Sequence, residues 1–142
     1  MRIEWTGDLD TGVSEIDAQH RELLERINAL LEVCAGSRPR HEARRVIDFL
    51  EEYVVTHFNT EEKLMTASDY PEYRRHKEEH AIFIERLADV KRKFHDEGAA
   101  ADVLHLATRT LIEWQDVHIR RTDRKLGEFL RSRRVGIPSD TV

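Results

Sequence analysis

The sequence predicts an all-α fold, an up-down-up-down antiparallel four-helix bundle with an extended N-terminal arm. Its 142 residues suit a single domain, and 36% charged residues with only six Gly and three Pro favour amphipathic helices over a sheet. Four stretches carry apolar residues at helical spacing, and the short breaks between them force antiparallel neighbours. We therefore expect residues 1–142 to form one domain, with the arm at 1–12 and a C-terminal tail at 131–142.

Composition narrows the classes of partner and compartment. A formal charge of −5 at pH 7 argues against a nucleic-acid partner, which needs a basic surface. Cys34 is the only cysteine, so we expect no disulfide within the chain and no thiolate metal cluster. The N-terminus lacks an apolar signal segment and no apolar run reaches the length of a membrane span. The sequence thus predicts a cytoplasmic protein with no membrane partner, and it identifies no protein partner.

The first helix is expected to begin near Ser14, because Ser14 and Asp17 resemble a capping box. Trp5, in the arm before it, is expected to cover the core. The apolar stripe of this helix comprises Val13, Ile16, Leu23, Leu24, Ile27, Leu30 and Leu31. His20 lies in the middle of the stripe. A histidine in such a place is more often a hydrogen-bonded core residue than a ligand, so its role depends on what the other helices supply.

The second helix, expected over residues 42–66 after a break at 36–40, carries a pair of metal-ligand types on its apolar face. That face comprises Val46, Phe49, Leu50, Tyr53 and Leu64. His57 and Glu61 are four residues apart and continue it, since positions i and i+4 lie on the same side of a helix. A glutamate on a core face cannot stay charged without a partner, and a metal ion is the simplest one.

The third helix, expected over residues 72–94 after a turn at 68–71, repeats this arrangement. Its apolar stripe comprises Tyr73, Phe83, Ile84, Leu87, Val90 and Phe94. His76 and His80 are again four residues apart and in line with the stripe. One such pair is weak evidence, because charged pairs at this spacing are common on solvated helix faces. Two pairs on adjacent helices strengthen the case for a shared metal site.

The fourth helix, expected over residues 101–130, adds two candidates at a less regular spacing. Its inward residues are Leu104, Ala107, Leu111, Trp114, Ile119, Leu126 and Phe129. His118 and Asp123 are five residues apart, which separates them by about 140° on an ideal helix. Either the helix widens locally, as π-bulges at functional sites do, or Asp123 reaches in from the edge.

Together the four helices offer more ligands than one ion can use. The candidates are His20, His57, Glu61, His76, His80, His118 and Asp123. Imidazole with carboxylate suits iron and similar ions. Two octahedral ions need about twelve contacts, and five nitrogens, four carboxylate oxygens and a shared oxide or hydroxide supply about eleven. One position is then open for a small ligand, while the remaining histidines are expected at the surface: His41, His95 and His105.

The motifs that carry these candidates resemble the single-domain bacterial hemerythrins, over residues 3 to about 130. They are Asp17-Ala18-Gln19-His20, His57-Phe58-x-x-Glu61-Glu62-x-Leu64-Met65, Tyr70-Pro71-x-x-x-x-His76-x-x-x-His80 and Trp114-x-x-x-His118-Ile119-x-x-x-Asp123. The resemblance implies two iron ions with a bridging oxide or hydroxide and with Glu61 and Asp123 as bridging ligands. It assigns the coordinatively saturated iron to His76, His80 and His118. It assigns the iron with the open position, where the family binds O2 reversibly as a hydroperoxide, to His20 and His57.

The resemblance also implies a pocket for O2, or for another small diatomic or peroxide ligand, at Trp114, Gln115 and Ile119. The family usually has an apolar residue, often Leu, where this chain has Gln115. Gln115 either turns out to the edge of the bundle and bonds water or a neighbouring side chain, or it faces the pocket. Two functions therefore stay open. The favoured one is a non-haem di-iron O2-binding protein: an oxygen carrier, store or sensor. The alternative is a di-iron oxidase, peroxidase or nitric-oxide-handling enzyme in which Gln115 alters the pocket.

Overall fold

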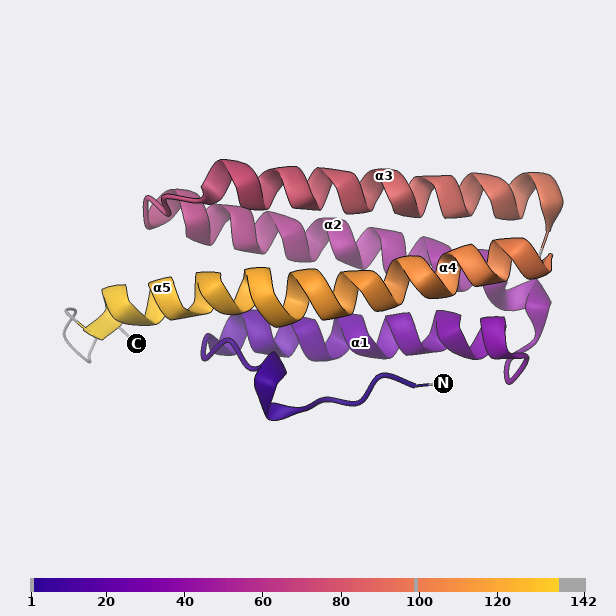
Figure 1. The fold of residues 1–142 in the computed structure, drawn as a ribbon, viewed down its shortest axis with the longest axis horizontal. Coiled ribbons are helices and arrows are strands. Elements are labelled where there is room, and N and C mark those ends of the chain that lie inside the picture. Colours follow the sequence, from indigo (N-terminus) through magenta and orange to yellow (C-terminus); the bar gives the residue numbers. More distant parts are fainter. Residues whose placement is uncertain (1, 99, 136–142) are drawn as a thin grey trace.

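The computed structural model describes residues 2–98 and 100–135, which form helices and no strand. Three long helices are α1 (Ser14–Ala35), α2 (Ala43–Ala67) and α3 (Tyr73–Glu97). A fourth, continuous column consists of α4 (Ala101–Glu113), η3 (Trp114–Asp123) and α5 (Arg124–Val135) (Figure 1). Short 3₁₀ turns precede α1 and α2, at η1 (Gly7–Leu9) and η2 (Arg40–Glu42).

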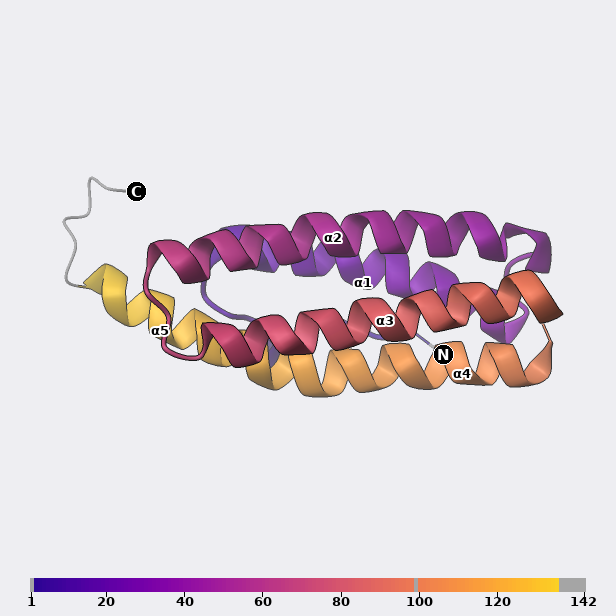
Figure 2. The same cartoon turned by 90° about the horizontal axis from the view of Figure 1, so that it is seen from above.

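The four columns form the predicted up-down-up-down bundle. Helix α1 packs against α2 and α4, and α3 packs against the same two helices, so consecutive columns are neighbours (Figures 1 and 2). Gly36 ends α1 in the left-handed conformation, at φ 83°, which glycine adopts without steric cost, and the chain then turns back towards α2. Among the described helices, none combines the length and hydropathy that crossing a membrane requires.

The N-terminal arm runs along the outside of the bundle and is fixed at two places. The Ile3 N–H donates to Asn28 Oδ1 at 2.7 Å, and Asn28 Nδ2 donates back to the Ile3 carbonyl at 2.9 Å. Trp5 is half-buried against the core, as predicted, with the Arg21 guanidinium 4.2 Å from the centre of its ring. The arm therefore covers the outer side of α1.

Three local predictions were wrong or incomplete. Ser14 does not cap α1 by a side-chain hydrogen bond; instead Asp17 accepts from the Thr11 N–H and hydroxyl, at 2.8 and 2.7 Å, because the arm folds back over the helix start. Phe49 and Ile84 were placed on the core stripe, yet they are 51% and 38% exposed. The fourth column continues to Val135 rather than ending near 130. Residues 136–142 of the predicted tail lie outside the described residues.

The core has two apolar clusters separated by a polar layer. The larger cluster extends from the layer towards the end of the bundle where α1 meets α2, and it includes Leu23, Phe58, Phe83 and Ile119. The smaller cluster lies on the other side and comprises Val13, Ile16, Met65, Tyr70, Leu126 and Leu130. In each column the predicted ligand falls between a residue of one cluster and a residue of the other, as His20 does between Ile16 and Leu23.

Candidate metal centre

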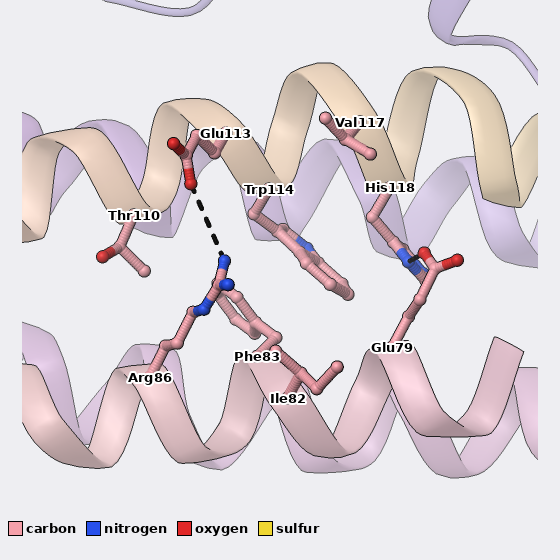
Figure 3. Close-up of a pocket in the computed structure, with 9 residues that line it drawn as sticks. All are labelled: Glu79, Ile82, Phe83, Arg86, Thr110, Glu113, Trp114, Val117 and His118. Carbon is pink, nitrogen blue, oxygen red and sulfur yellow. Dashed lines mark hydrogen bonds and ion pairs between the residues drawn. The ribbon is translucent and has the colours of Figure 1, made fainter. Parts of the chain in front are cut away.

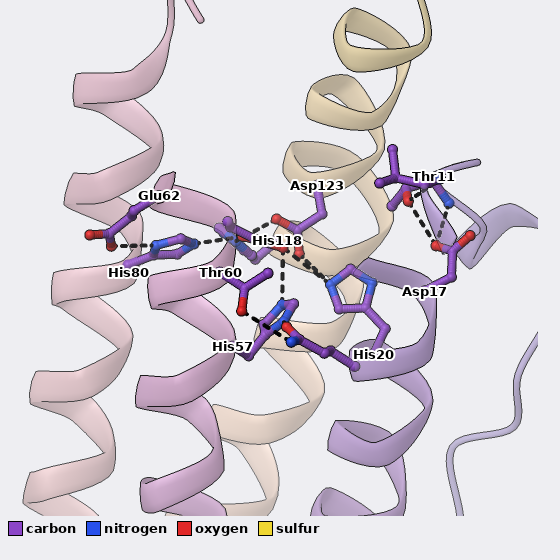
Figure 4. Close-up of polar contacts among 12 residues, drawn as sticks. Thr11, Asp17, His20, His57, Thr60, Glu62, His80, His118 and Asp123 are labelled. Atoms are coloured by element: carbon purple, nitrogen blue, oxygen red, sulfur yellow. Dashed lines mark hydrogen bonds and ion pairs between the residues drawn. The ribbon is translucent and has the colours of Figure 1, made fainter. Parts of the chain in front are cut away.

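The structure brings all seven predicted ligands together in this polar layer. Each of them is at most 2% exposed, although all are polar or charged: His20, His57, Glu61, His76, His80, His118 and Asp123. They come from all four columns, and Figure 4 shows several of their side chains converging on one region between the helices. The three histidines outside the prediction, His41, His95 and His105, are exposed as expected.

Glu61 turns one carboxylate oxygen to each of two groups of histidines. Its Oε1 atom lies 3.1 Å from His76 Nε2 and 3.0 Å from His80 Nε2. Its Oε2 atom lies 3.0 Å from His57 Nε2 and 3.4 Å from His20 Nε2. The carboxylate is thus divided between two ligand groups.

Asp123 divides its oxygens in the same way. Its Oδ1 atom lies 2.9 Å from His118 Nε2 and 3.0 Å from His76 Nε2, whereas Oδ2 lies 2.9 Å from His20 Nε2. Two sets of ligand atoms result, each within 4.8 Å, and both sets contain the two carboxylates. One set is completed by His76, His80 and His118, and the other by His20 and His57.

A π-helical segment aligns His118 with Asp123. Residues Trp114–Asp123 form the π-helix η3 between two α-helical stretches. In a π-helix the backbone hydrogen bond joins residues i and i+5, so side chains five positions apart lie on the same face. The local widening anticipated from the sequence is therefore present, and the fully buried Asp123 reaches the site without leaving the helix.

The ligand atoms fit metal ions better than they fit one another. The buried atoms with no hydrogen-bond partner among the described residues include His57 Nε2, Glu61 Oε2, His118 Nε2 and both Asp123 carboxylate oxygens. Two ligands at right angles around an ion, with bonds of roughly 2.1 Å, lie about 3.0 Å apart. The nitrogen–oxygen separations of 2.9–3.4 Å match this value. Buried polar atoms without partners are costly, and two bound cations would satisfy them.

The electrostatics agree with a site built for cations. Burial would raise the pKa values of Glu61 and Asp123, but the surrounding histidines outweigh it and hold both below their usual range. Burial would lower the pKa values of His20 and His76, but the two carboxylates outweigh it and raise both to about 9. Without metal, protons on the rings therefore balance the carboxylates, and metal binding must displace them.

Three residues that the sequence analysis did not assign support the rings from outside. His118 Nδ1 is 2.8 Å from Glu79 Oε1, and the hydrogen bond with this histidine lowers the Glu79 pKa although burial opposes it. Glu62 contacts Nδ1 of His80, and Gln19 contacts Nδ1 of His57. Aromatic stacking also holds two of the rings in place. The ring centres of Trp114 and His118 are 3.8 Å apart, and Phe58 stacks on His80.

The three residues predicted for the O2 pocket are all buried. Trp114 is 8% exposed, Gln115 6% and Ile119 0%. A surface pocket of about 350 Å³ lies between α3 and the fourth column, and Trp114 and His118 are among its lining residues (Figure 3). Trp114 lines that pocket, whereas Gln115 and Ile119 do not. No hydrogen bond joins the Gln115 amide to another described residue.

Comparisons with known proteins match this geometry. Residues 11–130 match the hemerythrin HHE cation binding domain. The bacteriohemerythrin of Stenotrophomonas maltophilia is 34% identical over 92% of this chain and 82% of its own length. The bacteriohemerythrin of Methylococcus capsulatus is 33% identical over 90% and 96%.

The crystal structure of a wild-type hemerythrin covers 90% of this chain and 97% of its own, at 30% identity and a TM-score of 0.74. The match to the crystal structure of a hemerythrin mutant with a leucine-to-alanine change covers 90% of this chain and 96% of the mutant chain, at 32% identity and a TM-score of 0.78. The chain therefore belongs to the hemerythrin family, and it is a non-haem protein whose two iron ions, joined by a bridging oxide or hydroxide, bind O2.

Proposed function

We propose that Glu61 and Asp123 bridge the two iron ions through their separate oxygens. The remaining ligands divide into His20 with His57 on one ion and His76, His80 and His118 on the other. The division of the carboxylate oxygens between the two histidine groups is the single observation that carries this assignment. With these ligands, three histidines would fill the coordination shell of one ion, and two would leave the other ion an open position for O2.

The chain's own part in this chemistry is to orient ligands and exclude water. When bound, the two ions supply the electrons and the open position that reversible O2 binding needs. Gln19 contacts His57 Nδ1 at 2.8 Å, which keeps a proton on that nitrogen and leaves Nε2 free to bind. Phe58 stacks on His80 with ring centres 3.8 Å apart and keeps water from that ring.

We place the O2 pocket at Trp114, Gln115 and Ile119. Ile119 is fully buried and supplies an apolar wall. Gln115 is only 6% exposed, but its amide has no hydrogen-bond partner among the described residues and is absent from the fully buried polar atoms, so it keeps some contact with solvent and is available to water or to a small ligand. The ligand is O2 or another small diatomic molecule or peroxide.

Reversible O2 binding, as a carrier, store or sensor, is the function we favour. Turnover as an oxidase, peroxidase or nitric-oxide-handling enzyme is the second candidate, and Gln115 is the observation in its favour. Mixing the diferrous protein with air while recording its optical spectrum separates them. A persistent oxygenated form supports binding, and rapid passage to the ferric form supports turnover. A formal charge of −5 supports the further proposal that nucleic acid is not a partner, and a cytoplasmic location stays a prediction.

A further inference from the structure

The five histidines differ in what contacts the ring nitrogen that faces away from the bridging carboxylates. On one side of the centre these outer partners are carboxylates. His118 Nδ1 lies 2.8 Å from Glu79 Oε1, and His80 Nδ1 lies 3.0 Å from Glu62 Oε2. Glu79 is held in place by a second hydrogen bond, from the Thr122 hydroxyl at 2.9 Å. Two negative charges therefore lie directly behind two ligands of one ligand group.

On the other side the outer partner is a neutral amide, and a short chain of hydrogen bonds fixes which way the amide points. The Thr60 hydroxyl donates its one proton to the Thr56 carbonyl at 3.2 Å. It must therefore accept from Gln19 Nε2, 3.0 Å away. This turns Gln19 Oε1 towards His57 Nδ1, so that ring has an uncharged partner.

The last two rings add no charge to either side. Nδ1 of His20 and Nδ1 of His76 are buried and have no hydrogen-bond partner among the described residues. Each ligand group thus contains one ring without an outer partner. The difference between the groups is two outer carboxylates against one outer amide.

We propose that Glu62 and Glu79 make the two iron positions electrically unequal. The ion held by His76, His80 and His118 then loses an electron more readily than the ion held by His20 and His57. An outer carboxylate draws the Nδ1 proton towards itself and increases electron donation from Nε2 to the metal. Fixed negative charge nearby also favours the ferric over the ferrous ion. In the one-electron step, this ferrous ion becomes ferric and the electron passes to an added one-electron acceptor. The inference rests on the proposed ligand assignment.

The test compares the two one-electron midpoint potentials of the iron-loaded protein by optical redox titration with mediator dyes. Glu79→Gln and Glu62→Gln keep an oxygen that can accept the hydrogen bond and remove the charge. Each is expected to raise the lower potential by about 59 mV, a tenfold change in the one-electron equilibrium, and to narrow the gap between the two potentials. Glu78→Gln makes the same charge change at an exposed position on α3 and should leave the gap unchanged.

Gln19→Glu is the reciprocal variant, because it adds a carboxylate on the side that lacks one. It should lower the higher potential and also narrow the gap. Because Gln19→Glu removes no hydrogen-bond acceptor, it tests the proposal even if Glu62→Gln or Glu79→Gln retains too little iron for titration. Equal shifts in the Glu79→Gln and Glu78→Gln proteins, or a wider gap in Gln19→Glu, overturn the proposal. Iron analysis of the parent protein tests the ligand assignment separately: fewer than two ions per chain would refute that assignment.

Discussion

At the scale of single residues, Gln115 provides the clearest test of carriage against turnover. Its amide can donate a hydrogen bond to a bound ligand or hold a water molecule beside it, and either would ease loss of the ligand. We expect Gln115→Leu to keep the oxygenated form longer after the diferrous protein meets air. Stopped-flow optical spectra give the decay rate. The control is Val117→Leu, an exposed position in the same π-helix. Equal or faster decay in Gln115→Leu would mean that this amide does not tune the pocket.

Loss of Glu61 should disturb the whole centre, since both histidine groups contact it. Replacing it by Gln keeps its size but removes the charge and one of the two metal-binding oxygens. We expect the variant to hold fewer than two iron ions per chain in elemental analysis. Glu113→Gln removes the same charge from a side chain that is 57% exposed and should bind iron like the parent. Two tightly held ions in Glu61→Gln would contradict the bridging role.

Sequence spacing located the proposed ligands, which the structure brings together, but not the residues that support them. His57, Glu61 and their counterparts on α3 could be predicted because a four-residue spacing within one apolar stripe is a property of a single helix. Glu79 could not, because its partner His118 is 39 residues away and on another column. The contact depends on the relative rotation and height of two packed helices, which spacing along one helix does not contain.

At the scale of elements, helical periodicity identified the faces more reliably than their edges. Phe49 and Ile84 lie next to buried positions on the helical wheel but are largely exposed. The buried faces instead include Ile47, Val54 and Phe58, which the predicted stripe left out. A stripe fixes the direction of the core, whereas the packing of neighbouring columns decides how far around the helix burial extends.

The packing of α5 against the arm gives a prediction at this scale. A Cβ atom on Gly127 would lie 2.3 Å from the Thr11 carbonyl oxygen and 2.6 Å from Thr11 Cβ. Alanine is the better helix former by about 1 kcal/mol, but overpacking costs roughly 1–3 kcal/mol. We therefore expect Gly127→Ala to lower the unfolding free energy, measured by urea denaturation, by about 1 kcal/mol. Gly7→Ala, which meets no atom within 4 Å, is the control. A Gly127→Ala protein that is more stable than the parent would show that the arm around Thr11 shifts at little energetic cost.

At the scale of the whole molecule, the polar layer formed by the proposed ligands also separates the core into two clusters. Metal that binds only the folded chain stabilises it by about 4 kcal/mol at a thousandfold excess over its dissociation constant. For 142 residues this corresponds to roughly 10 °C in Tm. We expect removal of iron by a chelator to lower the Tm in calorimetry by about that amount.

Hydrogen exchange can show which part of the bundle loses stability when iron is removed. Amides beside the smaller cluster, which includes Ile16 and Leu126, should lose more protection on iron removal than amides beside the larger one. Reloading with iron is the control and should restore both. An unchanged Tm after complete iron removal would mean that the bundle does not depend on the ions. The assignment of residues 1–142 to a single domain stays a prediction.

The stacking of Trp114 on His118 gives the protein an intrinsic optical reporter. The chain has two tryptophans, and only Trp114 contacts a proposed iron ligand, with ring centres 3.8 Å apart and planes 10° from parallel. Iron on that imidazole should quench the indole emission, whereas Trp5, half-buried on the arm, should emit at a constant level. Fluorescence should thus fall as iron is added to the metal-free protein, and Trp114→Phe should abolish the change. Metal loading could then be followed in real time without a label.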